Sequence, residues 1–186
     1  MLEIIFWIGL IIIIYAYFGY ILILFLLNSI KSTFRSQEKP VEDFQPEVSL
    51  LIAAFDEKTI IPKKMENTHR LNYPKEKLSV VWVTDGSEDG TPEHLLKEYP
   101  EVKVLHEPIR QGKTTALNRA MQHISTPFTV LCDANTMLDK NAFIQLLPPF
   151  SDEQIGCVAG EKRIARNAIE MAAGAGEGAY WQYESW

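Results

Sequence analysis

Apolar and polar stretches alternate along this chain, and the first apolar stretch is the longest. Residues 4–27 contain no charged side chain and are dominated by Ile, Leu, Phe, Tyr and Trp. A helix of about 20 apolar residues crosses a hydrocarbon core of roughly 30 Å. The pattern therefore predicts a transmembrane anchor over residues 1–30. A signal peptide is set aside, because it has a basic start and a shorter apolar region, whereas this chain begins Met1-Leu2-Glu3.

The two flanks of this apolar stretch differ in charge. Lys31, Arg35 and Lys39 follow it, whereas no Lys or Arg precedes it. Basic residues beside a membrane span stay on the cytoplasmic side. We therefore expect a single N-terminal span in the cytoplasmic membrane, with the remainder of the chain in the cytoplasm.

A polar linker is expected next, over residues 31–46, which contain Pro40 and Pro46 and show no apolar period. Residues 48–55 then form a nearly continuous apolar run, which is typical of a strand buried on both faces of a parallel sheet. Residues 57–71 suit a helix, because Ile60, Ile61 and Met65 share one face.

The same alternation of strand and helix patterns recurs to the end of the chain. Further strands are expected at 78–83, 102–105, 128–132 and 156–160, and helices at 92–99, 113–124 and 141–147. Strands that alternate with helices of this length imply βαβ units and a mostly parallel, Rossmann-like sheet. The sequence thus predicts an α/β domain over residues 47–186. In open sheets of this kind, ligands bind beyond the carboxyl ends of the strands.

Charge and composition exclude several kinds of site. The chain has 18 Lys and Arg against 24 Asp and Glu, a formal net charge of -6, whereas a nucleic-acid surface is normally basic. Cys132 and Cys157 lie inside apolar runs without ligand spacing, so we interpret them as reduced core residues of a cytosolic domain. The four histidines are scattered over different elements, which argues against a histidine-based metal site.

Carboxylates follow three of the predicted strands. Asp56 and Glu57 follow the first, Asp85 follows the second, and Asp133 with Asn135 follows the strand at 128–132. A single Asp in this place is most often a turn or capping residue. Three such strand ends at one edge indicate a ligand site, because like charges that converge there need a cation or a donor-rich ligand. Suitable ligands are a ribose, a base edge and a diphosphate bound to Mg²⁺ or Mn²⁺, since these metals prefer oxygen ligands.

A second motif starts the helix expected at 113–124. Gly112-Lys113-Thr114 resembles the end of a phosphate-binding P-loop. That loop needs a Gly about five residues earlier to form its nest of N–H groups, and the chain has Glu107 there. The P-loop is therefore rejected. Two interpretations of Lys113 remain: it points its charge at a diphosphate, or it is a solvated lysine at a helix start.

Four segments carry a resemblance to a known family. They are Ala53-Ala54-Phe55-Asp56-Glu57, Val83-Thr84-Asp85-Gly86-Ser87-Glu88-Asp89-Gly90-Thr91, Arg110-Gln111-Gly112-Lys113 with Ala116-Leu117-Asn118, and Asp133-Ala134-Asn135-Thr136. Together they resemble the inverting family-two glycosyltransferases of GT-A fold, especially the membrane-bound synthases related to cellulose, chitin and hyaluronan synthases. Their joint occurrence, in family order and with family-like gaps, makes the resemblance specific.

The resemblance implies a role for each of these acidic residues. Asp56 and Glu57 match the acidic loop beside the nucleotide, Asp85 matches the carboxylate that contacts uracil or its ribose, and Asp133 begins the metal-binding Asp-x-Asp. Asn135 stands in place of the second Asp of that motif, and its amide oxygen can ligate a cation without adding charge. Thr84 stands where an acidic residue often precedes Asp85.

The resemblance also implies an enzyme that continues past this chain. Residues 177–184 look like the segment between the donor half and the acceptor half, so the chain would hold the donor half, with the catalytic base beyond Trp186. The expected function is transfer of a hexosyl or N-acetylhexosaminyl unit from a UDP-sugar to a glycan or lipid-linked acceptor, with inversion. The alternative is a non-catalytic, membrane-anchored nucleotide-binding or scaffolding protein. A nucleotidyltransferase is disfavoured, because such enzymes place a Gly-rich loop after the first strand.

Overall fold

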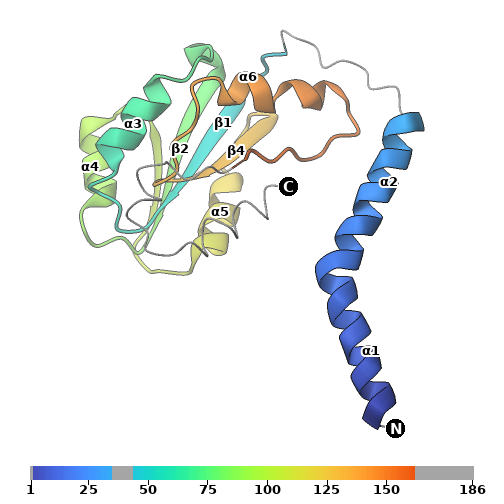
Figure 1. Cartoon of the computed structure of the whole chain (residues 1–186). Coiled ribbons are helices and arrows are strands. Elements are labelled where there is room, and N and C mark those ends of the chain that lie inside the picture. The colour runs from blue at the N-terminus through green and yellow to red at the C-terminus, as the bar shows by residue number, and fades with distance from the viewer. Residues whose placement is uncertain (1, 35–43, 162–186) are drawn as a thin grey trace, which may run out of the picture. The chain divides into compact units, whose positions relative to one another are not determined.

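The computed structural model describes residues 2–34 and 44–161, and the chain divides into two units, Met1–Lys39 and Pro40–Trp186 (Figure 1). The first unit contains α1 (Leu2–Ile14), one π-helical turn over Tyr15–Gly19, and α2 (Tyr20–Phe34). Leu2–Leu27 is long and apolar enough to cross a membrane. At about 1.5 Å per residue this helix reaches roughly 39 Å, which exceeds the hydrocarbon thickness of about 30 Å.

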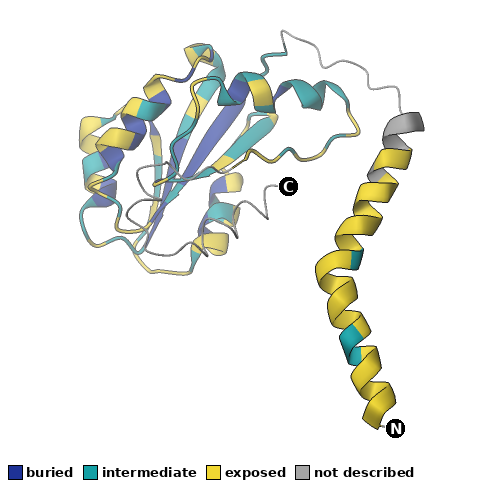
Figure 2. Ribbon diagram, viewed as in Figure 1, coloured by how far each residue is buried: buried dark blue, intermediate teal, exposed yellow. Residues whose placement is uncertain are grey.

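Most described residues of this helix are exposed, as the yellow colour of its ribbon shows in Figure 2. An apolar helix of this length is stable where lipid surrounds it. The helix continues to Phe34, so the first residues of the predicted 31–46 linker are helical. Residues 35–43 lie outside the described part of the chain.

The second unit contains one four-stranded sheet in which every neighbouring pair is parallel. Its strands are β1 (Val48–Ala54), β2 (Leu78–Asp85), β3 (Lys103–Glu107) and β4 (Phe128–Asp133), in the spatial order β3-β2-β1-β4. β2 and β3 therefore lie on one side of β1, and β4 pairs with β1 on the other side. This arrangement confirms the predicted α/β, Rossmann-like architecture.

Helices cover both faces of this sheet (Figure 1). They are α3 (Ile61–His69), α4 (Thr91–Glu98), α5 (Lys113–Met121) and α6 (Ala142–Leu146), with short 3₁₀ turns at Lys75–Lys77 and Pro148–Ser151. Alternate residues of β1 point to opposite faces. Leu50 and Ile52 join the hydrophobic cluster under α3, α4 and α6, whereas Leu51 packs with Ala116 and Ala120 of α5. Burial on both faces explains the continuous apolar pattern of β1, which is dark along most of its length in Figure 2.

The structure corrects the start of one predicted helix. The helix expected from residue 57 begins at Ile61, next to Pro62, which favours a first helical turn because a missing N–H costs nothing there. The preceding amides are used elsewhere: Glu57 N–H donates to Thr91 Oγ1 at 3.1 Å, and Lys58 N–H donates to Asp89 Oδ2 at 2.9 Å.

The strand predicted at 156–160 is wrong. These residues are irregular, and Cys157 is exposed rather than in the core, whereas Cys132 is half-buried. A short apolar run becomes a strand only when it can pair with the outer strand of a sheet. The run at 156–160 begins and ends with glycine, Gly156 and Gly160, and glycine weakens strand pairing. The segment at 177–184 lies outside the described residues.

Candidate functional site

The loops that follow β1 and β2 are tied together at the carboxyl edge of the sheet. Asp56 N–H donates to Ser87 Oγ at 3.2 Å, and Glu88 N–H donates to Asp56 Oδ1 at 2.9 Å. Asp56 has a positive φ of 52°, a conformation that Asp tolerates better than most residues and that concentrates at functional sites. Asp56 and Glu57 therefore lie in a loop that hydrogen bonds hold against the loop after β2.

Asp89 supplies the second brace between these loops. Its carboxylate accepts hydrogen bonds from Lys58 N–H and Thr91 N–H, both at 2.9 Å, and from the Thr91 hydroxyl. Burial by itself raises the pKa of the Asp89 carboxyl, but these hydrogen bonds outweigh burial and hold the pKa below its ordinary value of 3.8. Asp89 is thus a structural carboxylate that keeps two loops in place beside the predicted site.

Asp85, at the end of β2, organises a third loop. Its Oδ2 atom accepts hydrogen bonds from Gln111 N–H at 2.8 Å and Gly112 N–H at 2.6 Å. The residue is only 5% exposed. The same carboxylate that the resemblance assigns to the nucleotide therefore also fixes the loop just before α5, where Lys113 begins the helix.

Arg119 of α5 brings a positive charge to the buried side of Asp85. Its Nη1 atom lies 3.7 Å from Asp85 Oδ1 and 3.9 Å from Glu107 Oε2, and its Nη2 donates to Thr84 O at 3.2 Å. Asp85 Oδ1 and Arg119 Nη1 are both buried without a hydrogen-bond partner. The two groups face each other just beyond hydrogen-bond distance, so their attraction is mainly that of opposite charges in a poorly solvated place.

Gly86, in the loop after β2, lies close to Arg110, in the loop after β3. Gly86 has φ of 70°, and a Cβ atom there would lie 2.6 Å from Arg110 Cβ and 2.8 Å from Arg110 N. Gly86 N–H donates to Glu107 O at 2.7 Å. The Arg110 guanidinium in turn stacks on Phe55, with Cζ 3.8 Å from the ring centroid. The loops after β1, β2 and β3 are thereby packed against one another.

The end of β4 carries the residues predicted to hold a metal. Asp133 has a side chain that is 46% exposed, and its Oδ1 is in direct contact with Lys113 Nζ. Asn135 is exposed in the turn that follows, where Thr136 N–H donates to Asp133 O at 3.1 Å. Within residues 2–34 and 44–161, no three His, Cys, Asp or Glu side chains gather closely enough to hold a metal. The oxygen chemistry of Asp133 and Asn135 fits Mg²⁺ or Mn²⁺, but a ligand such as a diphosphate has to complete the coordination.

The structure brings four of the residues singled out in the sequence, Asp56, Asp85, Lys113 and Asp133, into loops that contact one another. Asp133 contacts Lys113, and Lys113 follows Gly112, whose amide binds Asp85. Asp85 is followed by the loop whose residues bind Asp56. The sequence prediction missed the contribution of Arg119, although its spacing from Ala116 and Ala120 on α5 indicates the face that packs on the sheet.

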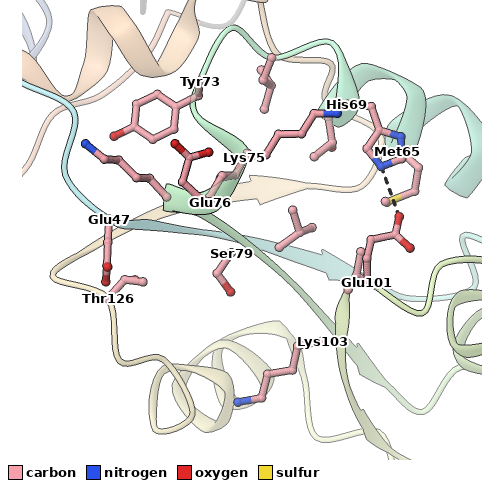
Figure 3. A pocket seen from close by; sticks show the side chains of 16 residues that line it. Glu47, Met65, His69, Tyr73, Lys75, Glu76, Ser79, Glu101, Lys103 and Thr126 are labelled. Carbon is pink, nitrogen blue, oxygen red and sulfur yellow. Dashed lines mark hydrogen bonds and ion pairs between the residues drawn. The ribbon is translucent and has the colours of Figure 1, made fainter. Parts of the chain in front are cut away.

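A hollow elsewhere on the domain lies at the opposite edge of the sheet (Figure 3). Its lining includes Glu47, Ser79 and Lys103, which stand at or near the starts of β1, β2 and β3. His69, at the end of α3, lies 3.3 Å from Glu101 there. The hollow thus lies at the amino ends of the strands, whereas ligands of parallel sheets bind at the carboxyl ends. It is therefore separate from the predicted site.

Comparison with known proteins gives a family match over most of the second unit. Residues 46–183 match the family described as "Glycosyltransferase like family 2". A beta-monoglucosyldiacylglycerol synthase from Nostoc sp. is 31% identical over 157 residues, which cover 82% of this chain and 33% of the relative. A poly-beta-1,6-N-acetyl-D-glucosamine synthase from Staphylococcus epidermidis is 26% identical over 133 residues, covering 70% of this chain and 31% of the relative. The chain thus spans about a third of the length of these curated relatives.

Solved structures agree with the fold. The mannosyltransferase PcManGT from Pyrobaculum calidifontis, in complex with GDP-Man and Mn²⁺, superposes with a TM-score of 0.67 and 27% identity over 82% of this chain and 46% of that chain. TarS from S. aureus, in complex with UDP-GlcNAc, superposes with a TM-score of 0.51 and 21% identity over 57% of this chain and 31% of that chain. The second likeness supports the fold alone.

Proposed function

Because this chain belongs to the family 2 glycosyltransferases, we propose that it binds the nucleotide-sugar donor of a membrane-anchored enzyme that transfers the sugar to a glycan or lipid-linked acceptor with inversion. The observation that carries the proposal is a set of hydrogen bonds between the loops after the strands: Lys113 contacts Asp133, the preceding Gly112 donates to Asp85, and Glu88 donates to Asp56. It gathers acidic and basic groups at the edge where parallel sheets bind ligands.

The donor in this proposal is a UDP-hexose or a UDP-N-acetylhexosamine. Relatives named as a glucosyldiacylglycerol synthase and a poly-N-acetylglucosamine synthase support a hexosyl or N-acetylhexosaminyl group, and they support a lipid-linked or a glycan acceptor. In our proposal Asp56, Glu57 and Asp85 surround the nucleoside, because carboxylates accept hydrogen bonds from ribose hydroxyls and the imide N–H of uracil.

The diphosphate of the donor is assigned to the turn after β4. Asp133 and Asn135 would hold Mg²⁺ or Mn²⁺ together with the diphosphate oxygens, and the metal would offset the charge of the departing UDP. The Mn²⁺ in the complex of PcManGT supports a divalent metal. Lys113 forms an ion pair with Asp133. In the proposed complex its ammonium would contribute positive charge beside the diphosphate.

The proposal predicts that UDP binding depends on a divalent metal. In calorimetric titrations of the full chain in detergent, chelation of Mn²⁺ is expected to weaken UDP binding at least about tenfold, because Asp133 and the diphosphate are both anionic. Asp133→Asn should bind UDP weakly with and without chelator. Asp139→Asn is the matched control, since Asp139 is an exposed acidic residue on the same segment whose carboxylate accepts from Asn141 N–H just before α6. Equal UDP affinities with and without chelator would refute the metal assignment.

We further propose that the helix Leu2–Leu27 spans the membrane with the catalytic domain in the cytoplasm. Lys31, Arg35 and Lys39 on one flank support this orientation. In intact cells, an impermeant thiol reagent should modify a cysteine introduced at Leu2 and should leave one introduced at Arg35 unmodified until the cells are permeabilised. Modification at position 35 in intact cells would contradict the orientation. Cys132→Ser and Cys157→Ser provide the background without other thiols.

A further inference from the structure

A lysine is completely buried behind the turn that carries Asp133 and Asn135. Lys64 of α3 has a relative exposure of 0%. Its Nζ atom donates to Thr136 O at 2.5 Å and to Cys132 Sγ at 3.1 Å. In the part of the chain that the structure describes, no carboxylate lies within ion-pair distance of it. The positive charge is therefore directed at the backbone of one turn rather than at a counter-charge.

Core stability alone does not explain a lysine at this position. A buried ammonium group without a carboxylate partner loses its hydration, and an apolar side chain of similar length avoids that loss. The other members of this face of α3 are Ile61, Met65 and Thr68, which pack in the core. What the amine adds is a strong, directional bond to the carbonyl of Thr136.

A second residue of α3, Asn67, forms two hydrogen bonds with the segment just after this turn. Asn67 donates through Nδ2 to Leu138 O and accepts from Leu138 N–H, both at 2.8 Å. Lys64 and Asn67 are three residues apart and so lie on adjacent positions of one helix face. On its other side the turn is held by Ala134 N–H, which donates to Ala53 O of β1 at 3.2 Å.

These bonds hold the backbone of the turn that carries Asp133, which is half-buried, and Asn135, which is exposed. Asp133 and Asn135 are accessible to a ligand, whereas the Thr136 and Leu138 backbone is held from behind. Metal ligands that must meet a cation together need a backbone of set shape, and the groups behind them provide it. We propose that Lys64 and Asn67 are positioning residues that hold the 133–138 segment so that Asp133 and Asn135 present their oxygens together to the metal-bound diphosphate. This inference rests on the proposed function.

The test uses the full chain in detergent with Lys64→Met, which keeps most of the length of the side chain and removes the amine. Thr68→Ala is the matched control: it removes a buried hydrogen bond of the same helix, from Thr68 Oγ1 to Lys64 O at 2.9 Å, and has no bond to residues 132–138. The first measurement is amide hydrogen exchange without ligand. The second is the ratio of UDP affinity with Mn²⁺ to UDP affinity with chelator.

We expect Lys64→Met to speed exchange in peptides over 133–138 roughly tenfold and to lower the affinity ratio roughly tenfold, as fits the loss of one charge-assisted hydrogen bond. Thr68→Ala should change neither, even if it lowers the melting temperature. If Lys64→Met gives too little folded protein, Asn67→Ala must show both changes in smaller measure. Unchanged exchange over 133–138, or an unchanged ratio, overturns the inference.

The same measurements separate failure of this inference from failure of the proposed function. A wild-type chain that binds UDP equally well with Mn²⁺ and with chelator overturns both the metal assignment and the role of Lys64. A wild-type chain with clear metal dependence, together with a Lys64→Met variant of the same ratio, overturns only the positioning role.

Discussion

Replacing Asp85 by alanine is expected to lower the free energy of unfolding by about 3–5 kcal/mol, the range found when one member of a buried ion pair is removed. The change leaves the Arg119 guanidinium with Glu107 as its one nearby carboxylate among the described residues, at 3.9 Å. It also leaves the amides of Gln111 and Gly112 without the acceptor that now binds them. Denaturant unfolding of the full chain in detergent measures the loss, and UDP titration should show greatly weakened binding in the folded fraction.

Two further variants show whether the pairing is the cause. Asp89→Ala also removes a carboxylate with several hydrogen bonds, but Asp89 is less buried and braces a loop at the start of α4, so a loss of about 1 kcal/mol is expected, as for a helix-capping residue. Combining Asp85→Ala with Arg119→Met should cost less than the sum of the single changes, because the guanidinium that loses Asp85 is then removed as well. Equal losses for Asp85→Ala and Asp89→Ala would contradict this account.

Replacing Gly86 by alanine is expected to cost roughly 2–5 kcal/mol, the sum of a left-handed backbone penalty and a steric clash. The new Cβ would lie 2.6 Å from Arg110 Cβ and 2.8 Å from Arg110 N, so the backbone itself has to move. That shift would carry the Arg110 guanidinium away from Phe55 and disturb the loop held by Asp85. We therefore expect loss of UDP binding together with loss of stability.

Gly90→Ala is the matched control for this change. Gly90 also has a positive φ, of 84°, but the nearest atom to a new Cβ is the flexible tip of Lys58, at 3.1 Å. Only the backbone penalty of about 1–2 kcal/mol should remain. A loss at Gly86 no greater than the loss at Gly90 would show that the contact with Arg110 does not constrain the site.

The sequence predicted the main elements of the sheet because each strand carries a short apolar run. The two central strands, β1 and β2, are mostly buried, whereas the outermost strand β4 is half-buried with Leu131 exposed. The strand-end rule then placed Asp56, Asp85 and Asp133 at one end of the sheet. The wrong prediction of a strand at 156–160 also came from an apolar run. An apolar run of five residues states a preference, but pairing with a neighbouring strand has to be available before that preference becomes a strand.

Side chains that act from inside the fold were beyond the reach of the sequence pattern. Lys64 and Arg119 each occupy a position in an amphipathic helix where a lysine or arginine is usually a solvated surface residue. The burial of Lys64 and of the Arg119 Nη1 atom depends on what packs against each helix: the end of β4 for Lys64, and the end of β2 for Arg119. Likewise, nothing local predicts that Asp85 binds the amides of Gln111 and Gly112, which lie more than twenty residues away.

The sequence by itself determined the membrane-length apolar helix, the alternation of strands and helices, and the carboxylate and amide side chains placed after the strands, because each depends on residues close together in the chain. Tertiary structure alone decided which of those side chains are exposed and which are held by buried partners. Asp85 is enclosed by a loop and an arginine, whereas Asp133 remains accessible on a turn fixed by Lys64. The physical reason is that hydrogen bonding and desolvation depend on the surroundings of a group, and distant segments supply those surroundings only when the chain folds.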